Sequence, residues 1–251
     1  MTLQDIYNQL SYGELRLLFV GGSDIDSTDT GMTTEQFIKL LPTIQLGLTA
    51  LYKQFLLREG QFFIQRQENM QSYVLNRKFA QSNTSSSEQV KYIIDTDIPF
   101  DSELFKVERV YGLLNEQPYE IPLNEINNKS ALRTPSNQLL MLPALPDEAP
   151  WLAETDVMKV YYRTDHPKID VNIANAVPLA QEIELPVTHL EALCFYVASR
   201  IHNPMGMVPG AMHEGNNYYE RYRQEVGLLK QLNLEIDTFA EISKLHDRGF
   251  V

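Results

Sequence analysis

The chain has little that could hold it together covalently or anchor it in a bilayer. Its only cysteine is Cys194, so no disulfide can form within the chain, and a disulfide-stapled scaffold is excluded. No apolar run approaches the roughly 18 residues that span a bilayer. The start at Met1 lacks the basic and apolar regions of a signal peptide. We therefore expect a soluble protein, made in the cytoplasm, with no membrane partner.

Basic residues are scarce relative to acidic ones. Lysine and arginine number 21 against 33 aspartate and glutamate residues, which gives a formal net charge of -12. An acidic surface repels phosphate, so tight nucleic-acid binding over a broad face is disfavoured. The apolar fraction of 43%, with 10% aromatic residues, can support a core, and it argues against a chain that is disordered throughout.

Sequence patterns that carry reaction chemistry are also missing. There is no Gly-rich phosphate loop with its following Lys and Ser or Thr, and no Gly-x-Ser-x-Gly elbow. No pair of cysteines exists to bind zinc, and the five histidines are scattered. We therefore expect no catalytic, cofactor-binding or metal-binding residues, and a protein that is not an enzyme.

Four stretches come closest to reactive sites, and each has a simpler structural interpretation. The turn from His202 to His213 holds three methionines and could bind a soft metal, but a hydrophobic turn between helices explains it better. Asp165-His166 has no obvious nucleophile nearby. Cys194 lies on an apolar helix stripe, where a buried thiol is the default. The acidic stretch Asp24–Asp29 lacks the glycine and the spacing of a calcium loop.

The first 60 residues have helical patterns. Residues 2–10 place apolar side chains at helical spacing, and Thr33 and Gln36 have the spacing of a capping box. Pro42 should begin a further helix, and Gly60 is placed to stop it. One apolar face of that helix repeats at steps of four, three and four residues: Ile44, Leu48, Leu51 and Phe55.

The pattern changes between residues 61 and 185. Short aromatic and β-branched runs alternate with polar residues, for example over Tyr119–Leu123 and Met158–Arg163. Such alternation is typical of antiparallel strands with one covered face. We assign residues 61–185 to an inserted antiparallel β domain.

Helical patterns return after Pro186. One apolar stripe consists of Leu190, Leu193, Cys194, Val197 and Ile201. A later stripe, on a helix from about Glu214 to Leu232, consists of Tyr219, Tyr222, Val226 and Leu229. The predicted fold class is α+β: an antiparallel helical bundle, built from residues 1–60 and 186–235, that carries the inserted β-rich domain. Residues 236–251 form a C-terminal arm.

Aromatic residues of the last helix and the arm are the candidate contact residues. With the neighbouring arginines, tyrosines of the helix could stack on single-stranded nucleic acid or anchor a helix contact within or between subunits, and the overall acidity favours the second. The arm is either a third helix on its own domain or a segment that orders on a partner. The candidates are Tyr218, Tyr219, Tyr222, Phe239, Ile242, Leu245, Arg248, Phe250 and Val251.

Three packing patterns occur together in this chain. The first is the long helix at Leu40–Phe55. The second is a β-rich set formed by Ile121–Asn124, Leu132–Pro135 and Leu139–Pro143. The third is a helix, turn and helix at Leu190–Arg200, His202–Gly206 and Tyr218–Tyr222. Together they resemble the head-to-tail adaptor, or connector, proteins of tailed bacteriophages, and the resemblance covers most of the chain.

The resemblance implies a viral structural protein of the virion neck. It implies a ring, usually of twelve subunits, below the portal at the capsid vertex, with a channel through which genomic DNA passes without sequence-specific binding. The implied partners are other copies of the chain through the helical bundle, the portal protein through the C-terminal arm, and tail or nozzle proteins beneath. An acidic channel lining suits this role, because phosphates find no counter-charge there.

Two alternatives remain open at this point. One is a tail-associated binding module, in which the β insert contacts other tail proteins. The other is a glycan hydrolase that uses a pair of carboxylates from Glu103, Glu108 and Asp156. Ordinary solvated carboxylates explain these three residues better than a catalytic pair does.

Overall fold

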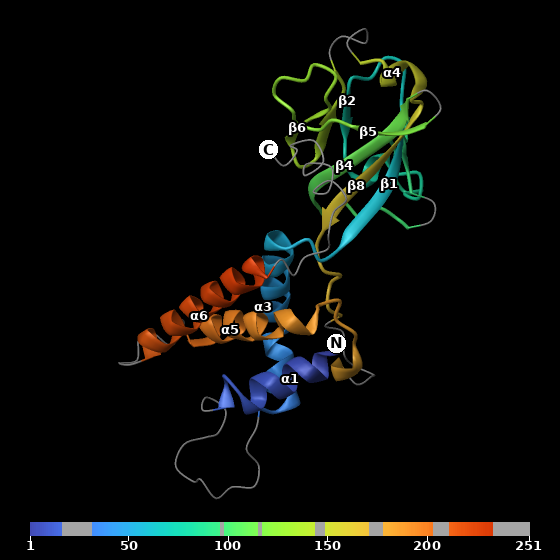
Figure 1. The fold of residues 1–251 in the computed structure, drawn as a ribbon. Coiled ribbons are helices and arrows are strands. Elements are labelled where there is room, and N and C mark those ends of the chain that lie inside the picture. Colours follow the sequence, from blue (N-terminus) through green and yellow to red (C-terminus); the bar gives the residue numbers. More distant parts are fainter. Residues whose placement is uncertain are drawn as a thin grey trace, which may run out of the picture. The chain divides into compact units, whose positions relative to one another are not determined.

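The structure, a computed structural model, describes residues 1–16, 32–95, 98–114, 117–143, 149–170, 178–202 and 211–232 (Figure 1). They form two compact units. The first unit consists of Met1–Leu57 together with the described residues from His166 onward, and the second consists of Arg58–Asp165. The site analysed below lies in the first unit.

Four long helices build the first unit. They are α1 (Leu3–Tyr12), α3 (Thr34–Gln54), α5 (Leu190–His202) and α6 (Ala211–Gln231). Two short 3-10 helices, η3 (Pro178–Ala180) and η4 (Val187–His189), precede α5. The apolar stripes expected on these helices are confirmed for most of their members, but Tyr219 of the α6 stripe is exposed. The buried members are Leu3, Ile6 and Leu10 on α1, Ile44, Leu48 and Leu51 on α3, Leu193, Cys194 and Val197 on α5, and Tyr222, Val226 and Leu229 on α6.

Helix α3 begins with the expected capping box. The Thr33 amide donates to Gln36 Oε1 at 2.8 Å, and the Gln36 amide donates to Thr33 Oγ1 at 3.3 Å. The expectation that Pro42 starts a new helix is wrong, since α3 continues through it. Pro42 has no amide hydrogen, so the carbonyl four residues before it lacks its helical hydrogen bond. Pro42 is exposed, so water can bind that carbonyl instead. The helix ends at Gln54, and Gly60 lies in a strand instead of stopping it.

The contact of α3 with α5 is a close crossing at Gly47. Figure 1 shows α3 running across α5 instead of along it. A Cβ atom added at Gly47 would lie 2.6 Å from Leu193 Cδ1 and 3.0 Å from Tyr196 Cδ1. Both of these side chains are buried. The missing side chain at Gly47 therefore lets the two helices approach closely.

An irregular stretch before α5 ties α1 and α3 together. The Leu3 amide donates to the Gln181 carbonyl at 3.0 Å. The Tyr52 hydroxyl donates to the Glu184 carbonyl, and the Glu184 amide donates to His166 Nε2 at 3.1 Å. Extended backbone therefore belongs to the helical unit and satisfies its polar groups there.

The second unit contains two antiparallel sheets. The larger sheet has the strand order β3-β1-β8-β4-β5, and the smaller one has the order β2-β7-β6. The strands of the larger sheet are β1 (Glu59–Gln65), β3 (Ile93–Ile94), β4 (Leu104–Leu114), β5 (Gln117–Ile121) and β8 (Val157–Thr164). Those of the smaller sheet are β2 (Ser72–Val74), β6 (Arg133–Ser136) and β7 (Leu139–Met141). A 3-10 helix, η1 (Arg77–Phe79), and a short helix, α4 (Trp151–Glu154), complete this unit.

The expected alternation along β8 is confirmed. Met158 and Val160 are fully buried, and they pair in register with Ile64 and Phe62 of β1, which are also buried. Trp151 is a further large buried side chain of this core, and its Nε1 donates to the Ser130 carbonyl at 3.1 Å. One face of the larger sheet therefore supplies the core of the second unit.

The predicted fold class is wrong. The described residues form a mixed α/β protein with five α-helices and two antiparallel sheets, and not an antiparallel helical bundle with an inserted β domain. Short connections favour antiparallel helix neighbours, but here Gly47 lets α3 cross α5 closely. An irregular stretch, instead of another helix, ties α1 to α3. The strand-rich part forms two sheets and includes helix α4.

Substituting the crossing glycine should destabilise the first unit. Gly47→Leu should lower the free energy of unfolding by about 1–3 kcal/mol, because the new side chain must displace buried Leu193 and Tyr196. Gly227 is the matched control, since it also lies inside a helix but has nothing within 4 Å of an added Cβ. Gly227→Leu should raise the free energy of unfolding by up to about 1 kcal/mol. Chemical denaturation of both variants measures the two changes, and equal shifts would contradict a close crossing at Gly47.

A charge on the buried face of α3 should unfold the helical unit. Leu48→Asp would place an unpaired carboxylate at a fully buried position of α3, and Val226→Asp would place one at a largely buried position of α6. Leu46 is 60% exposed on the same helix as Leu48, so Leu46→Asp should melt close to the wild type. Circular dichroism melting curves compare the three variants. A wild-type curve for Leu48→Asp would show that the helix face is wrongly assigned.

Candidate interaction surface

Helix α6 carries a groove beside the end of α3. The groove has a volume of about 310 Å³. Gln54 of α3 lines one end, and one side of α6 supplies the rest: Tyr219, Tyr222, Arg223, Val226, Gly227 and Lys230. We call this surface the α6 groove. Every residue that lines it belongs to the first unit.

The floor of the α6 groove is buried and packed against α5. Tyr222 is buried, and its ring stands edge-on to Tyr196 with the centroids 5.3 Å apart. Its hydroxyl accepts a hydrogen bond from Gln54 Nε2 at 3.0 Å. Burial, followed by the neighbouring Tyr196 and Tyr219, raises the pKa of Tyr222 to about 12, so the hydroxyl remains protonated. Val226 beside it is also buried.

The rim of the α6 groove is aromatic and basic. Tyr219 is 44% exposed, and its ring centroid lies 6.0 Å from that of Tyr222. Arg223 reaches Glu220 at 3.5 Å, in an exposed ion pair that contributes little stability. The Lys230 ammonium lies 5.9 Å from the centroid of the Phe55 ring. None of the described residues that line the groove is acidic, but Glu220 beside the rim offsets the charge of Arg223. Lys230 therefore supplies an excess positive charge at the groove, in a chain whose net charge is negative.

Gly227 forms an open part of the groove wall. A glycine inside a helix costs roughly 1 kcal/mol relative to alanine. At Gly47 a close helix contact offsets that cost, because a side chain there would clash with Leu193. A Cβ added at Gly227 would meet nothing within 4 Å. Within the described part of the chain, no packing contact accounts for a glycine at this position.

The opposite side of α6 is acidic. Burial raises the pKa of the Glu14 carboxyl, with repulsion from Glu191 adding to it and Arg221 opposing it. Burial, followed by Glu191, also raises the pKa of Glu225. Glu14 Oε2 is buried and accepts no hydrogen bond from the described residues. Glu191 therefore repels both Glu14 and Glu225, and Arg221 is the cation that attracts Glu14.

The tyrosines predicted as contact residues have different surroundings. Tyr218 stacks on His202 with ring centroids 5.1 Å apart, and its hydroxyl donates to the Glu14 carbonyl at 3.2 Å. Tyr218 and Tyr222 thus pack within the unit, while Tyr219 is the exposed one of the three. The remaining predicted contact residues lie outside the described residues: Phe239, Ile242, Leu245, Arg248, Phe250 and Val251.

Sequence reasoning missed five residues of the α6 groove as contact residues. They are Gln54, Arg223, Val226, Gly227 and Lys230. Gly227 gave a signal, since an isolated glycine inside a helical pattern usually has a packing or functional reason. Gln54 gave none, because its place beside α6 depends on how α3 packs.

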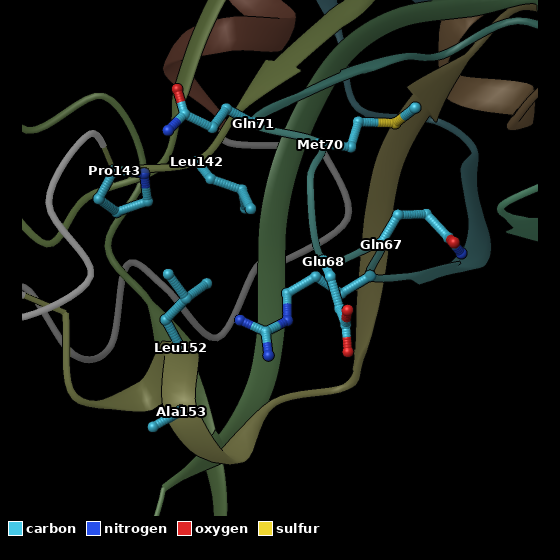
Figure 2. A pocket seen from close by; sticks show the side chains of 9 residues that line it. Gln67, Glu68, Met70, Gln71, Leu142, Pro143, Leu152 and Ala153 are labelled. Atoms are coloured by element: carbon cyan, nitrogen blue, oxygen red, sulfur yellow. The ribbon is translucent and has the colours of Figure 1, made fainter.

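A second hollow lies in the second unit. It has a volume of about 260 Å³. Figure 2 shows Leu142, Pro143 and Leu152 on one side of it and Glu68 and Met70 on the other. The remaining lining residues are Arg66, Gln67, Gln71 and Ala153. The lining combines apolar side chains with amides and a charge of each sign, and it offers no convergent set of reactive groups.

Two residues weighed for reaction chemistry have structural roles. Cys194 is fully buried, and burial raises the pKa of its thiol, so the reactive thiolate is disfavoured. His166 is buried, with Nδ1 2.5 Å from the Pro167 carbonyl and Nε2 accepting from the Glu184 amide. Both ring nitrogens are engaged by backbone groups, so His166 positions the chain.

The carboxylates considered for glycan hydrolysis do not all come together. The Glu108 carboxylate pairs with Arg163 at 3.0 Å, and the Thr164 hydroxyl donates to the Glu103 carbonyl, so both glutamates lie near one end of β8. Asp156 is 85% exposed at the other end of that strand. At the rise of an extended strand the two ends are roughly 20 Å apart. Carboxyl pairs of glycosidases lie within about 10 Å.

Most residues of the two stretches weighed as metal sites lie outside the described residues. The residues Asp24, Asp26, Asp29, Met205 and Met207, and the side chains of Met212 and His213, lie outside the described residues. His202 is buried against Tyr218. In the part of the chain that the structure describes, no three His, Cys, Asp or Glu residues gather as metal ligands would.

The comparisons with known proteins add no family. A search against models of known protein families and a search of curated protein sequences each returned no match. Across the described ranges, no helix combines the length and apolar character that crossing a bilayer requires.

The acidic side of α6 should make stability depend on pH. A carboxyl with a raised pKa in the folded state stabilises the fold at low pH and loses that contribution as the pH rises through the folded value. Glu14→Gln removes this ionisation, so the variant should have a higher Tm than the wild type at pH 7 and nearly the same Tm at pH 4. Calorimetry at both pH values tests this. A Tm difference that is the same at both would contradict the assignment.

Proposed function

We propose that this chain is a structural head-to-tail adaptor of a tailed bacteriophage. In this proposal identical copies form a ring, usually of twelve, in the virion neck between the portal and the tail. The observation that carries it is the α6 groove: an exposed tyrosine, a basic rim and an open glycine beside a buried aromatic floor suit contact with another protein surface. The resemblance of the packing patterns to adaptor proteins supports the same assignment.

The charge of the chain fits a DNA channel. Each copy contributes a formal charge of -12, and a ring sums that charge over all of its members. DNA that passes through such a channel is repelled by its walls and does not adhere to them. Genomic DNA is therefore a passing partner of the proposed ring, without sequence-specific contacts.

The proposed ring has partners on both sides. The portal protein lies above it, and tail or nozzle proteins lie below. Residues 236–251, which lie outside the described residues, are the proposed arm that reaches the portal. Ordering of such a segment on its partner would add contact area at an entropic cost.

A second candidate function is a tail-associated binding module. The hollow of the second unit favours it, since Leu142, Leu152 and Met70 offer apolar contact next to polar side chains. In that role the second unit binds tail proteins, whether or not the chain closes into a ring. Gln71→Trp, which fills the hollow, should then block tail binding and leave portal binding unchanged.

Mixing the purified chain with portal rings tests the proposed function. Sedimentation and negative-stain imaging should find the chain bound to the portal as a ring. A chain that lacks Phe250 and Val251 should keep the wild-type melting curve and bind the portal about tenfold more weakly, because part of the arm contact is lost. Absence of any association between the wild-type chain and the portal would defeat the proposal. Unchanged binding of the shortened chain would defeat only the role of the arm.

A further inference from the structure

The two sides of α6 carry mixed charges with excesses of opposite sign. On the groove side Glu220 pairs with Arg223 at 3.5 Å, which leaves Lys230 as the cation in excess. On the other side Arg221 lies four residues before Glu225 and offsets only part of the negative charge of Glu225 and Glu191.

Arg223, Gly227 and Lys230 follow one another at steps of four and three residues, so they share one side of the helix. Glu225 lies two residues from both Arg223 and Gly227. A step of two residues turns about 200° round a helix, so Glu225 lies on the opposite side. Glu191 of α5 is exposed, and its negative charge repels the Glu225 carboxylate. We call the surface formed by Glu191 and Glu225 the acidic flank.

These two surfaces have the properties that a head-to-tail contact needs. A ring forms when one surface of each copy binds a different surface of the next copy. The α6 groove is positive and open, while the acidic flank holds carboxylates that repel one another. A cation brought by a neighbouring copy would offset that repulsion, and opposite potentials favour the correct pairing.

We infer that the α6 groove of one copy receives the acidic flank of the next copy, so that α6 contributes to both halves of the contact. The inference rests on the proposed function, because it names the surfaces through which the proposed ring closes. Lys230 and Arg223 face Glu225 and Glu191 of the neighbour. The bare backbone at Gly227 admits the neighbour's side chains, as the bare backbone at Gly47 admits Leu193 within the chain.

A second copy is the occupant that the charges favour. Lys230 gives the groove an excess positive charge, because Arg223 is paired with Glu220. The complementary carboxylates are Glu225 on the other side of α6 and Glu191 of α5. Tyr219 at the rim adds an exposed aromatic side chain of the kind enriched in protein interfaces. An acidic segment of another protein is the alternative occupant of the groove. A measurement of self-association distinguishes the two occupants, because only the second copy requires it.

Two charge reversals test the pairing by sedimentation velocity of the full-length chain. Lys230→Glu makes the groove acidic, and Glu225→Lys makes the flank basic. Each variant alone should self-associate about tenfold more weakly than the wild type, because like charges then face each other. A mixture of the two variants should recover association, since an acidic groove meets a basic flank and the unchanged surfaces still match. Lys39→Glu on α3 is the matched control, because Lys39 is exposed and lies outside both surfaces.

A steric variant tests the role of the open glycine. Gly227→Leu fills the groove, so self-association should be lost. The same variant should have a Tm about 2–4 °C above that of the wild-type monomer, because leucine favours the helix. A loss of association together with a higher Tm cannot arise from misfolding.

The outcomes separate this inference from the proposed function. Recovery of association in the mixture, with Lys39→Glu unchanged, supports the inference. A wild-type chain that stays monomeric at the highest concentration overturns it, as does normal self-association of Lys230→Glu and Gly227→Leu. In either case, binding to portal rings tests the adaptor function separately. The groove would then bind a partner other than a second copy.

Discussion

The close crossing of α3 and α5 at Gly47 is the contact on which the first unit depends. Because Leu193 and Tyr196 occupy the space of the missing side chain, α3 has one position against α5. That position brings Gln54, at the end of α3, to the hydroxyl of Tyr222 on α6. The floor of the α6 groove is thus set by a contact near the middle of α3. Core packing and the candidate interaction surface are therefore coupled.

Two glycines inside helices show how the same residue type serves inner and outer contacts. The space beside Gly47 is occupied by side chains of the same chain. The space beside Gly227, on the side of α6 that bears Arg223 and Lys230, is open. Glycine lowers the helix propensity at both positions relative to alanine. In the proposed ring, the cost at Gly227 is offset by contact with a neighbouring copy. The buried aromatic floor gives that contact a fixed shape, which limits the ordering entropy lost on binding.

Parts of the fold could be predicted from the sequence, because local periodicity reports burial. The stripe of Ile44, Leu48 and Leu51 and the alternation along β8 both appear in the structure. The fold class could not be predicted, because the crossing at Gly47 and the irregular stretch that receives Tyr52 depend on contacts far apart in the chain. Pro42 misled the helix assignment, since solvent exposure lets α3 tolerate it.

The candidate site was only partly visible in the sequence. Tyr219 could be singled out as an aromatic contact, but its neighbours Tyr218 and Tyr222 have partners inside the unit, which spacing alone does not reveal. The charge difference between the two sides of α6 depends on Glu191 of α5, so it needs the tertiary structure.

In the proposed ring, α6 joins identical copies of this chain. Native mass spectrometry of the purified chain over a range of concentrations measures this self-association. We expect species at whole multiples of 28.9 kDa, ending in one closed ring. A single species of 28.9 kDa at every concentration would mean that α6 does not join copies of the chain.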